Sequence, residues 1–386
     1  MRLKIHNPVL LTLSILLAVA AATLPFLDYA PNRLVSGQPL PLHQVLEGGW
    51  WLVAVPPGIL ILQAFLPVTR GNLALVVLLS EGLFIALIAL SGHQATLLSQ
   101  QGSTLARTSW GSGFWLAAGL CLLMAADAAG RLSKNALWRL LLNGQIWLPV
   151  IVLLLSDRLD QLALLKEYAN RRDVFDQALS QHLLLLAGTL IPTLLISIPL
   201  GWLCAKKKAV QSPVFAVLNV IQTVPSIALF GLLIAPLAGL ARAFPALADL
   251  GISGIGMAPA LIALVLYALL PLVRSVVAGL QQVPKEVIET AEGMGMTRGQ
   301  IFWHAEVPLA LPVLLTGLRV IAVQTVGMAV IAALIGAGGF GTIIFQGLLS
   351  SALELVLLGV IPVIALAVII DALFKFLLSV IEAKRQ

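Results

Sequence analysis

The stretch PKEVIETAEGMGMTRGQIFWHAEVP, residues 284–308, decides how this chain folds, because it carries helix signals of its own between two long apolar segments. Pro284 suits the first turn of a helix, where its missing N–H would have no partner anyway. Glu286 and Glu289 follow near the positive end of that helix. The stretch therefore predicts a folded loop, which we bound at 279–308.

The second half of this loop predicts a corner followed by another helix. Gly293 and Gly295 offer a stop, because glycine adopts left-handed dihedral angles at little cost. Thr297 can cap a second helix, and Gln300 three residues later completes a capping box. We expect that helix to stop near Pro308. Such a partly apolar element either docks against a partner or lies flat on lipid headgroups.

The composition around this loop is that of a membrane protein. The 386 residues are 60% hydrophobic and only 10% charged, against about 25% charged in soluble domains. The net charge of +6 comes from short basic runs between apolar stretches, a pattern that sets membrane orientation and excludes a nucleic-acid-binding protein. The two cysteines, Cys121 and Cys204, predict neither a disulfide framework nor a metal site.

Apolar stretches long enough to cross a bilayer recur along the chain, since a spanning helix needs about 20 such residues. The sequence predicts an all-α polytopic membrane protein with about ten transmembrane helices. The candidates are 9–27, 50–67, 72–91, 111–129, 140–156, 182–204, 213–236, 257–278, 309–335 and 354–378.

The distribution of Lys and Arg predicts the orientation. With the N-terminus in the cytoplasm, ten crossings place the C-terminus there as well, and 16 of the 23 basic residues then lie on that side. The run 206–208 is the strongest single anchor. The basic start and apolar stretch of the first segment also resemble a signal peptide, but its length favours a retained helix over a cleaved one.

The most polar part of the chain, 157–181, divides it into two halves of five predicted helices. We therefore expect an N-terminal membrane region over 1–156, a polar periplasmic linker over 157–181 and a core transmembrane domain over 182–382. No internal sequence repeat supports an inverted-repeat transporter.

The loop resembles the cytoplasmic "EAA" loop of ABC importer permeases, which runs Glu-Ala-Ala, three residues, Gly, and about a dozen residues later Leu-Pro. Here the pattern is Glu289-Thr290-Ala291, then Gly295, then Val307-Pro308. Thr290 and Val307 depart from the commonest residues at their positions, while the spacing is kept.

Three further segments, 219–233, 267–274 and 332–341, resemble permeases for glycine betaine, choline and carnitine, the osmoprotectant family. The resemblance covers about 178–382, and the extra N-terminal half departs from the minimal domain of that family.

The resemblance implies a type I importer (MetI-like) permease of the bacterial inner membrane that carries an osmoprotectant such as glycine betaine. Expected partners are cytoplasmic ATP-binding subunits, a second permease copy or paralogue, and a periplasmic substrate-binding protein. It also implies an ATPase-coupling role for one set of residues: Glu289, Ala291, Gly295 and Pro308.

The chain itself has no Gly-x-x-x-x-Gly-Lys-Ser/Thr loop to cradle phosphates, so we expect neither ATPase activity nor a cofactor of its own. ATP would be bound by the partner subunit, and no catalytic residue is predicted.

Polar and helix-breaking residues inside the core spans are candidates for the translocation path: Gln222, Thr223, Pro225, Tyr267, Gly338 and Gly339. The glycine run at 336–341 reads either as a gate beside the path or as an outer turn, because irregular backbone at membrane depth must be buried in protein or face a cavity. Trp202, Phe230 and Tyr267 offer either cation–π surface for a quaternary ammonium or ordinary packing.

Two other classes of protein compete with a permease. An ion-coupled secondary transporter needs an ionisable group inside the membrane, and Glu81 lies midway along the third span. Its alternative interpretation is a carboxyl group that bonds between helices. A membrane-embedded enzyme ranks last, since the five histidines lie in loops or at segment ends.

Overall fold

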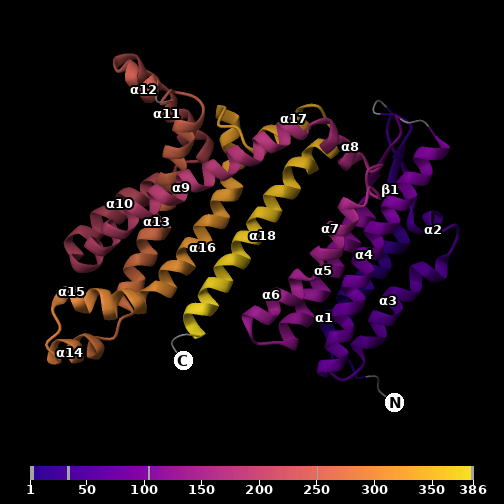
Figure 1. Cartoon of the computed structure of the whole chain (residues 1–386), viewed down its shortest axis with the longest axis horizontal. Helices are drawn as coiled ribbons and strands as arrows, with labels where there is room; N and C mark the ends of the chain where they lie inside the picture. The colour runs from indigo at the N-terminus through magenta and orange to yellow at the C-terminus, as the bar shows by residue number, and fades with distance from the viewer. Residues whose placement is uncertain (1–3, 33–34, 103–104, 250, 384–386) are drawn as a thin grey trace. The chain divides into compact units, whose positions relative to one another are not determined.

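The chain, seen in a computed structural model, is described over residues 4–32, 35–102, 105–249 and 251–383. It divides into two compact units, unit 1 (Met1–Asn170) and unit 2 (Arg171–Gln386). Both are built mainly of long helices (Figure 1). The predicted helical, polytopic membrane fold is thus confirmed, and unit 1 adds a small sheet that the sequence did not predict.

Unit 1 combines helices with a small sheet. Its elements are α1 (Pro8–Thr23), β1 (Pro25–Ala30), β2 (Gln38–Pro41), α2 (Leu42–Val45), α3 (Trp50–Ala64), α4 (Arg70–Gln101), β3 (Arg107–Trp110), α5 (Ser112–Leu132), α6 (Ala136–Gly144), α7 (Trp147–Leu155) and α8 (Ala163–Asn170).

Three helices of unit 1, α1, α4 and α6, begin at side-chain caps, and the unit packs through small residues. Asn7 Oδ1 accepts a hydrogen bond from the Leu10 N–H at 3.2 Å, and Pro8 follows at the first helical position. α5 buries several alanines, among them Ala117 and Ala128, which allow α4 and α1 to approach it closely. This packing forms the main apolar core of unit 1.

A three-stranded antiparallel sheet in the order β2-β1-β3 closes one end of unit 1, which we call the sheet end. The sequence prediction ran the first helix through 27, but α1 ends at Thr23 and the chain enters β1 at Pro25. The residue before a proline avoids helical dihedral angles, which explains this early end. Leu27 is fully buried where β1 lies between both neighbouring strands.

A buried ion pair ties α8 to this sheet. Arg107 Nη1 lies 3.0 Å from Glu167 Oε2, and the Glu167 side chain is only 2% exposed. Next to it, Lys166 Nζ donates to the Ala106 carbonyl at 3.0 Å. Burial, with the neighbouring Arg107 charge, holds the pKa of Lys166 below its usual range. The stretch 157–181 thus contains α8 and the beginning of the next helix.

Unit 2 is helical throughout its described part. Its elements are α9 (Arg172–Lys206), α10 (Lys208–Thr223), α11 (Ser226–Ala243), α12 (Pro245–Asp249), α13 (Met257–Gln281), α14 (Lys285–Gly293), α15 (Arg298–Ile301), the π-helix η1 (Phe302–Glu306), α16 (Val307–Ala332), the 3-10 helix η2 (Ala333–Ile335), α17 (Phe340–Leu349) and α18 (Leu353–Ala383).

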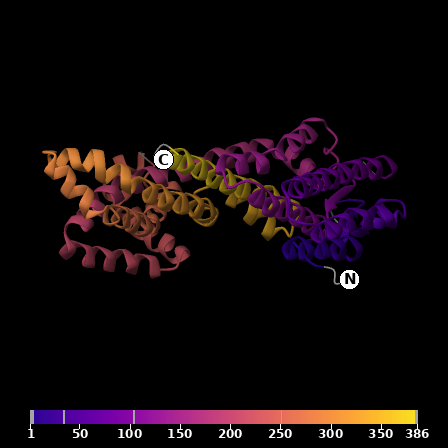
Figure 2. The same cartoon turned by 90° about the horizontal axis from the view of Figure 1, so that it is seen from below.

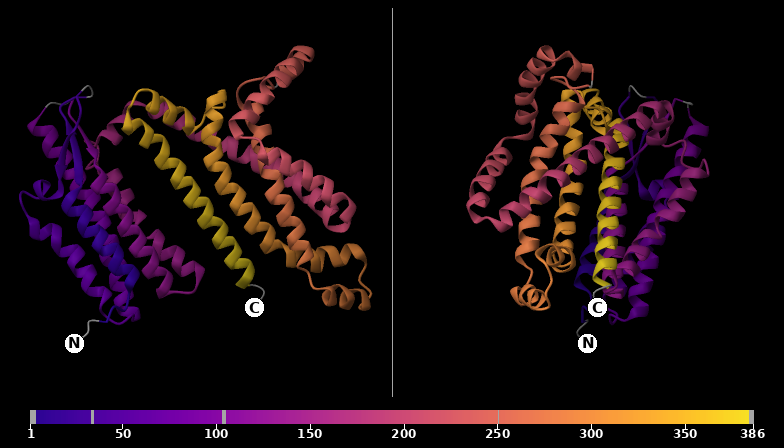
Figure 3. Two further views of the ribbon diagram at one scale, coloured as in Figure 1. Left: turned by 180° about the vertical axis from the view of Figure 1, so that it is seen from behind. Right: turned by 60° about the vertical axis from the view of Figure 1, so that its left-hand side comes forward.

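Helix α13 is the centre of unit 2, since it packs against α9 on one side and α16 on another. α16 in turn packs against α18, so α13, α16 and α18 run side by side in Figure 3. The helices α14 and α15 lie at one end of this row, which we call the loop end, and α17 lies at the other (Figure 1).

Eight helices in the described residues are long and apolar enough to cross a membrane, and α1 and α3 are shorter apolar helices. Together these ten correspond to the ten predicted stretches. One prediction of detail is wrong: 213–236 is not a single span, because the helix breaks at Val224, just before Pro225. Proline disfavours a helical residue before it, which places the break there.

The Arg107–Glu167 pair predicts a large stability loss for Glu167→Gln. Removing one partner of a buried pair leaves the other charge uncompensated, and we expect a cost of about 3–5 kcal/mol in the free energy of unfolding. Lys166→Met on the same helix is the matched control, with an expected cost below about 1 kcal/mol. Unfolding in mixed detergent micelles measures both, and equal losses would contradict the role of the ion pair.

Candidate coupling loop and translocation path

The corner at Gly295 has the geometry of a Schellman helix ending. Gly295 adopts a φ of 81°, its N–H donates to the Glu292 carbonyl at 2.9 Å, and the Met296 N–H donates to the Ala291 carbonyl at 3.1 Å. Both glycine signals noticed in the sequence therefore lie where α14 ends. The predicted left-handed corner is at Gly295.

The second helix of the loop begins at the predicted capping box. The Thr297 N–H donates to Gln300 Oε1 at 2.8 Å, and the Gln300 N–H donates back to Thr297 Oγ1 at 3.4 Å. The helix does not stop near Pro308, however. It continues through η1 into α16, because Pro308 stands in the first turn of α16, where its lack of an N–H is tolerated.

The predicted coupling residues differ in exposure. Glu289, Gly295 and Pro308 are exposed, whereas Ala291 is 4% exposed and forms the inner face of α14. Large apolar side chains nevertheless point outward on the same loop, with Met294 71% and Trp303 67% exposed. In Figure 2 the loop is seen in orange at the left-hand end of the picture.

An ion pair fastens the loop to the end of α9, and sequence reasoning missed its acidic member. Lys206 Nζ lies 2.7 Å from Glu306 Oε1, and the Glu306 side chain is 9% exposed. Trp202 adds an edge-to-face contact with Phe302, at 6.5 Å between ring centroids. Lys206 was interpreted only as part of a topology signal, and its partner lies 100 residues further along the chain.

The residues predicted for the path near the first break gather around Tyr267. The Gln222 side chain donates from Nε2 to the Tyr267 carbonyl at 2.9 Å. The Tyr267 hydroxyl donates to the Val224 carbonyl, at the point where α10 ends and α11 has not yet begun. Thr223 bonds within its own helix to Val220. Pro225, the last residue before α11, is exposed.

The glycine run forms a second break, buried by α9. Gly338 and Gly339 have φ values of 81° and 78°, so both need the left-handed region that glycine favours. The Gly339 N–H donates to Gln181 Oε1 at 2.9 Å. His182 is fully buried, donates from Nε2 to the Val326 carbonyl at 3.1 Å and packs against Phe340. The second break is thus clamped by two neighbouring residues of α9.

One apolar cluster lies between these breaks. Its buried members include Phe230, Tyr267 and Ala337, so both sets of predicted path residues border the same core. Trp202 does not join Phe230 and Tyr267 there, because its aromatic contact is to the coupling loop.

A charged network that sequence reasoning did not find joins α16 to α18. Arg319 Nε lies 2.7 Å from Asp371 Oδ1, and Lys375 Nζ lies 2.6 Å from Asp371 Oδ2. The two basic partners explain how the Asp371 carboxylate is held within a mostly apolar helix.

Glu81 belongs to unit 1, whereas the residues predicted for the path all belong to unit 2. It is 6% exposed and accepts a hydrogen bond from Gln145 Nε2 at 2.7 Å, between α6 and α7. This hydrogen bond is what the second interpretation of Glu81 expects, a carboxyl group that bonds between helices. Among the described residues, no three His, Cys, Asp or Glu side chains gather as metal ligands do.

The hydroxyl bond at the first break predicts the effect of Tyr267→Phe. Losing the donor leaves the Val224 carbonyl without this partner, and we expect the free energy of unfolding to fall by about 1 kcal/mol. Thr223→Val is the control, since its hydroxyl bonds only within its own helix, and its expected cost is smaller. If unfolding in micelles gives both variants the same stability, the hydroxyl does not hold the break.

Two family descriptions match separate parts of the chain. Residues 4–165 match "ABC transporter permease YehY, N-terminal domain", which agrees with the prediction that the chain as a whole resembles this glycine betaine permease. Residues 197–382 match "Binding-protein-dependent transport system inner membrane component".

Similar proteins align with about half of the chain. The osmoprotectant import permease protein OsmW of Salmonella typhimurium is 37% identical over 204 residues, which are 53% of this chain and 90% of that protein. The carnitine transport permease protein OpuCB of Listeria monocytogenes is 37% identical over 50% of this chain and 80% of its own length. The choline permease protein OpuBB of Bacillus subtilis is 32% identical over 53% and 85%.

A solved structure of the MetNI methionine ABC transporter in an inward-facing conformation aligns with 54% of this chain and 96% of its own, with a TM-score of 0.46 and 20% identity. From the two family matches and from relatives above 30% identity that are covered almost whole, we conclude that the chain belongs to the inner membrane permease components of binding-protein-dependent ABC transport systems.

Proposed function

We propose that this permease is the membrane-spanning subunit of an ATP-driven importer, and that loop 279–308 docks into a separate cytoplasmic ATPase. The observation that carries the proposal is the rigid corner at Gly295, which exposes Met294 and Trp303 beside it. Exposed apolar anchors on an ordered element are what a protein interface needs at its centre. The Lys206–Glu306 pair supports the same role, because it ties the loop to a membrane helix.

The chemistry of ATP hydrolysis belongs to the partner subunit in this proposal. The chain has no phosphate-binding Gly-Lys pair, so ATP is bound elsewhere and this subunit needs no cofactor. Glu289, Ala291, Gly295 and Pro308 form the coupling contact, and closure of the ATPases moves the helices attached to it.

The proposed substrate is a small quaternary ammonium osmoprotectant such as glycine betaine. The relatives carry osmoprotectant, carnitine and choline in their names, and carnitine and choline share a bulky quaternary ammonium cation with no proton on nitrogen. A periplasmic binding protein delivers the substrate, and this partner makes most of the choice between substrates.

Two permease subunits, identical or paralogous, enclose the path. Gln222, Thr223, Pro225, Tyr267, Gly338 and Gly339 line or shape it, because they form the two helix breaks around one core. Both termini lie in the cytoplasm, as the excess of Lys and Arg on that side favours. The three regions 1–156, 157–181 and 182–382 act as an accessory membrane region, a connection and the core permease.

The proposed docking of loop 279–308 predicts that the Gly295→Asp variant no longer binds the ATPase subunit. Aspartate tolerates left-handed dihedrals better than most residues, and nothing lies within 4 Å of a Cβ at this position, so the loop itself should keep its shape. A new negative charge at the corner should lower the ATPase retained on co-purification at least tenfold.

Two controls separate charge at the corner from other effects. Gly295→Asn has the same shape without the charge and should retain more of the ATPase than the aspartate variant. Gly71→Asp adds the same charge at an open position in the first turn of α4, where acidic residues are tolerated, and should retain all of it. An ATPase that stays with Gly295→Asp, or never associates with the natural chain, would refute the docking.

Substrate and energy source are tested together by uptake in cells that contain the binding protein and the ATPase. We expect labelled glycine betaine, choline or carnitine to enter, and uptake to stop when the phosphate-binding lysine of the ATPase is replaced. Glu81→Gln should leave uptake within about twofold, since the amide still bonds to Gln145. Uptake that survives ATPase inactivation and is lost with Glu81→Gln would instead support an ion-coupled transporter.

A further inference from the structure

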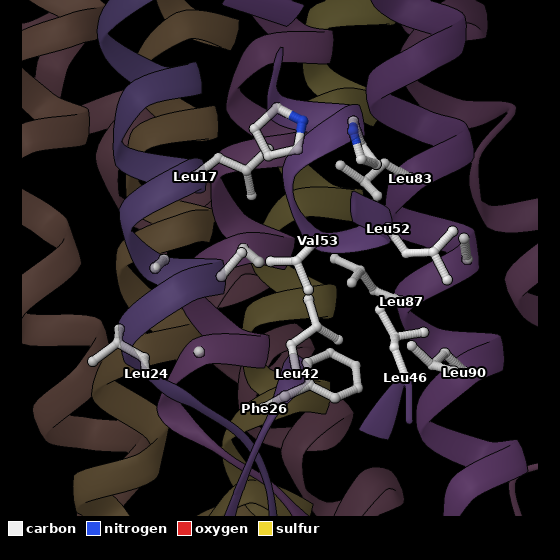
Figure 4. Close-up of a pocket in the computed structure, with 17 residues that line it drawn as sticks. Leu17, Leu24, Phe26, Leu42, Leu46, Leu52, Val53, Leu83, Leu87 and Leu90 are labelled. Carbon is white, nitrogen blue, oxygen red and sulfur yellow. The ribbon is translucent and has the colours of Figure 1, made fainter. Parts of the chain in front are cut away.

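An apolar pocket of about 190 Å³ lies inside unit 1, between α1, α3, α4 and α5 (Figure 4). Every side chain that lines it is apolar, and leucines supply most of its surface. A cavity whose side chains are all apolar offers water few hydrogen-bond partners, and such cavities bind hydrocarbons instead.

The pocket opens sideways between α3 and α4. Its lining residues Leu52 on α3 and Ala86 on α4 are both exposed, whereas Leu17, Val53 and Leu87 deeper inside are buried. α3 packs mainly against α1 and has few contacts with α4. The mouth is therefore a gap in the helical wall that faces whatever surrounds the unit.

Prolines in α3 explain why this wall does not close. Pro56 and Pro57 stand side by side within α3 and both line the pocket. Adjacent prolines remove two backbone hydrogen-bond donors from a helix and favour a bend in it, which disfavours close packing of α3 along α4. With 15 residues, α3 reaches about 22 Å, less than the roughly 30 Å of a hydrocarbon core.

Aromatic residues place the mouth close to the membrane surface. Trp50 and Trp51 are 52% and 67% exposed and directly precede Leu52 at the rim. Exposed tryptophans at a helix end mark the level of the lipid headgroups. The rim lies immediately after them on the same helix, so the mouth opens into the hydrocarbon just below the headgroups.

We propose that this pocket binds one acyl chain of a bilayer lipid, which enters between α3 and α4 from the leaflet at the sheet end of unit 1. A flexible chain of methylene groups fits the narrow mouth and restores the dispersion contacts that an empty cavity lacks. A protein segment is a poor occupant, because its backbone polar groups would find no partners among carbon walls. Lipid chains are also the medium that already faces the exposed rim.

The experiment uses the full-length permease in vesicles that contain a phosphatidylcholine with a photoreactive diazirine in one acyl chain. After irradiation, mass spectrometry maps the labelled peptides. We expect labelling of 52–57 and 83–90 to exceed, by at least threefold, labelling around Leu195, a 71% exposed residue of α9 that serves as the reference for simple lipid contact.

Blocking variants test whether the excess comes from the pocket. Ala86→Phe fills the mouth and should lower the labelling of 52–57 at least fivefold, while Ala54→Phe, at an exposed position that does not line the pocket, should leave it unchanged. Ala21→Leu fills the interior, and Ala22→Leu on the exposed side of α1 is its control.

Labelling of the pocket that only equals the Leu195 reference would overturn the proposal. An excess of labelling that persists equally in the Ala86→Phe variant and in the Ala21→Leu variant would also overturn the proposal. An acyl chain inside the pocket cannot coexist with either added side chain. Circular dichroism of each variant confirms that its helices are intact before labelling.

Discussion

The absence of hydrogen-bond partners in lipid is the constraint on which the rest of this structure depends. Each backbone group at membrane depth must find its partner within the protein, so helices dominate and irregular backbone survives only where side chains complete it. The break before α11 has the Tyr267 hydroxyl on the Val224 carbonyl, and the glycine run has Gln181 on the Gly339 N–H. The two places where the core helices are interrupted are thus also the places where polar side chains of neighbouring helices converge.

Several charges of the described chain follow the same logic, because each of them has a partner of opposite charge on another element. Glu306 meets Lys206 and Asp371 meets Arg319 in unit 2, and Glu167 meets Arg107 beside the sheet of unit 1. Each pair joins two elements far apart in the chain, so each contributes to the arrangement of helices as well as to charge balance. Buried pairs are costly to break on one side, which makes them fixed points in the fold.

Local signals were readable from sequence and long-range ones were not. The Gly295 corner and the Thr297–Gln300 capping box depend on residues within one turn of each other, and both are present in the structure. Pro25 was a local signal for the end of α1 that the apolar stretch up to residue 27 outweighed. The strand β1 that follows was missed because it forms only by pairing with strands that lie further along the chain, one of them beyond residue 100. The π-helical turn before α16 and the ion-pair partner of Lys206 were missed because no local sequence pattern predicts either of them.

The continuity of the chain from the loop into the membrane has a mechanical consequence. Arg298–Ile335 is one uninterrupted helical segment of 38 residues, bent at η1, where α15 turns away from the axis of α16 (Figure 3). At 1.5 Å per residue the segment is about 57 Å long along its path. The Lys206–Glu306 ion pair lies at the bend, because Glu306 belongs to η1. The Gly295 corner therefore lies just before this segment begins and the glycine run just after it ends, so one continuous helical segment connects the loop to the second break.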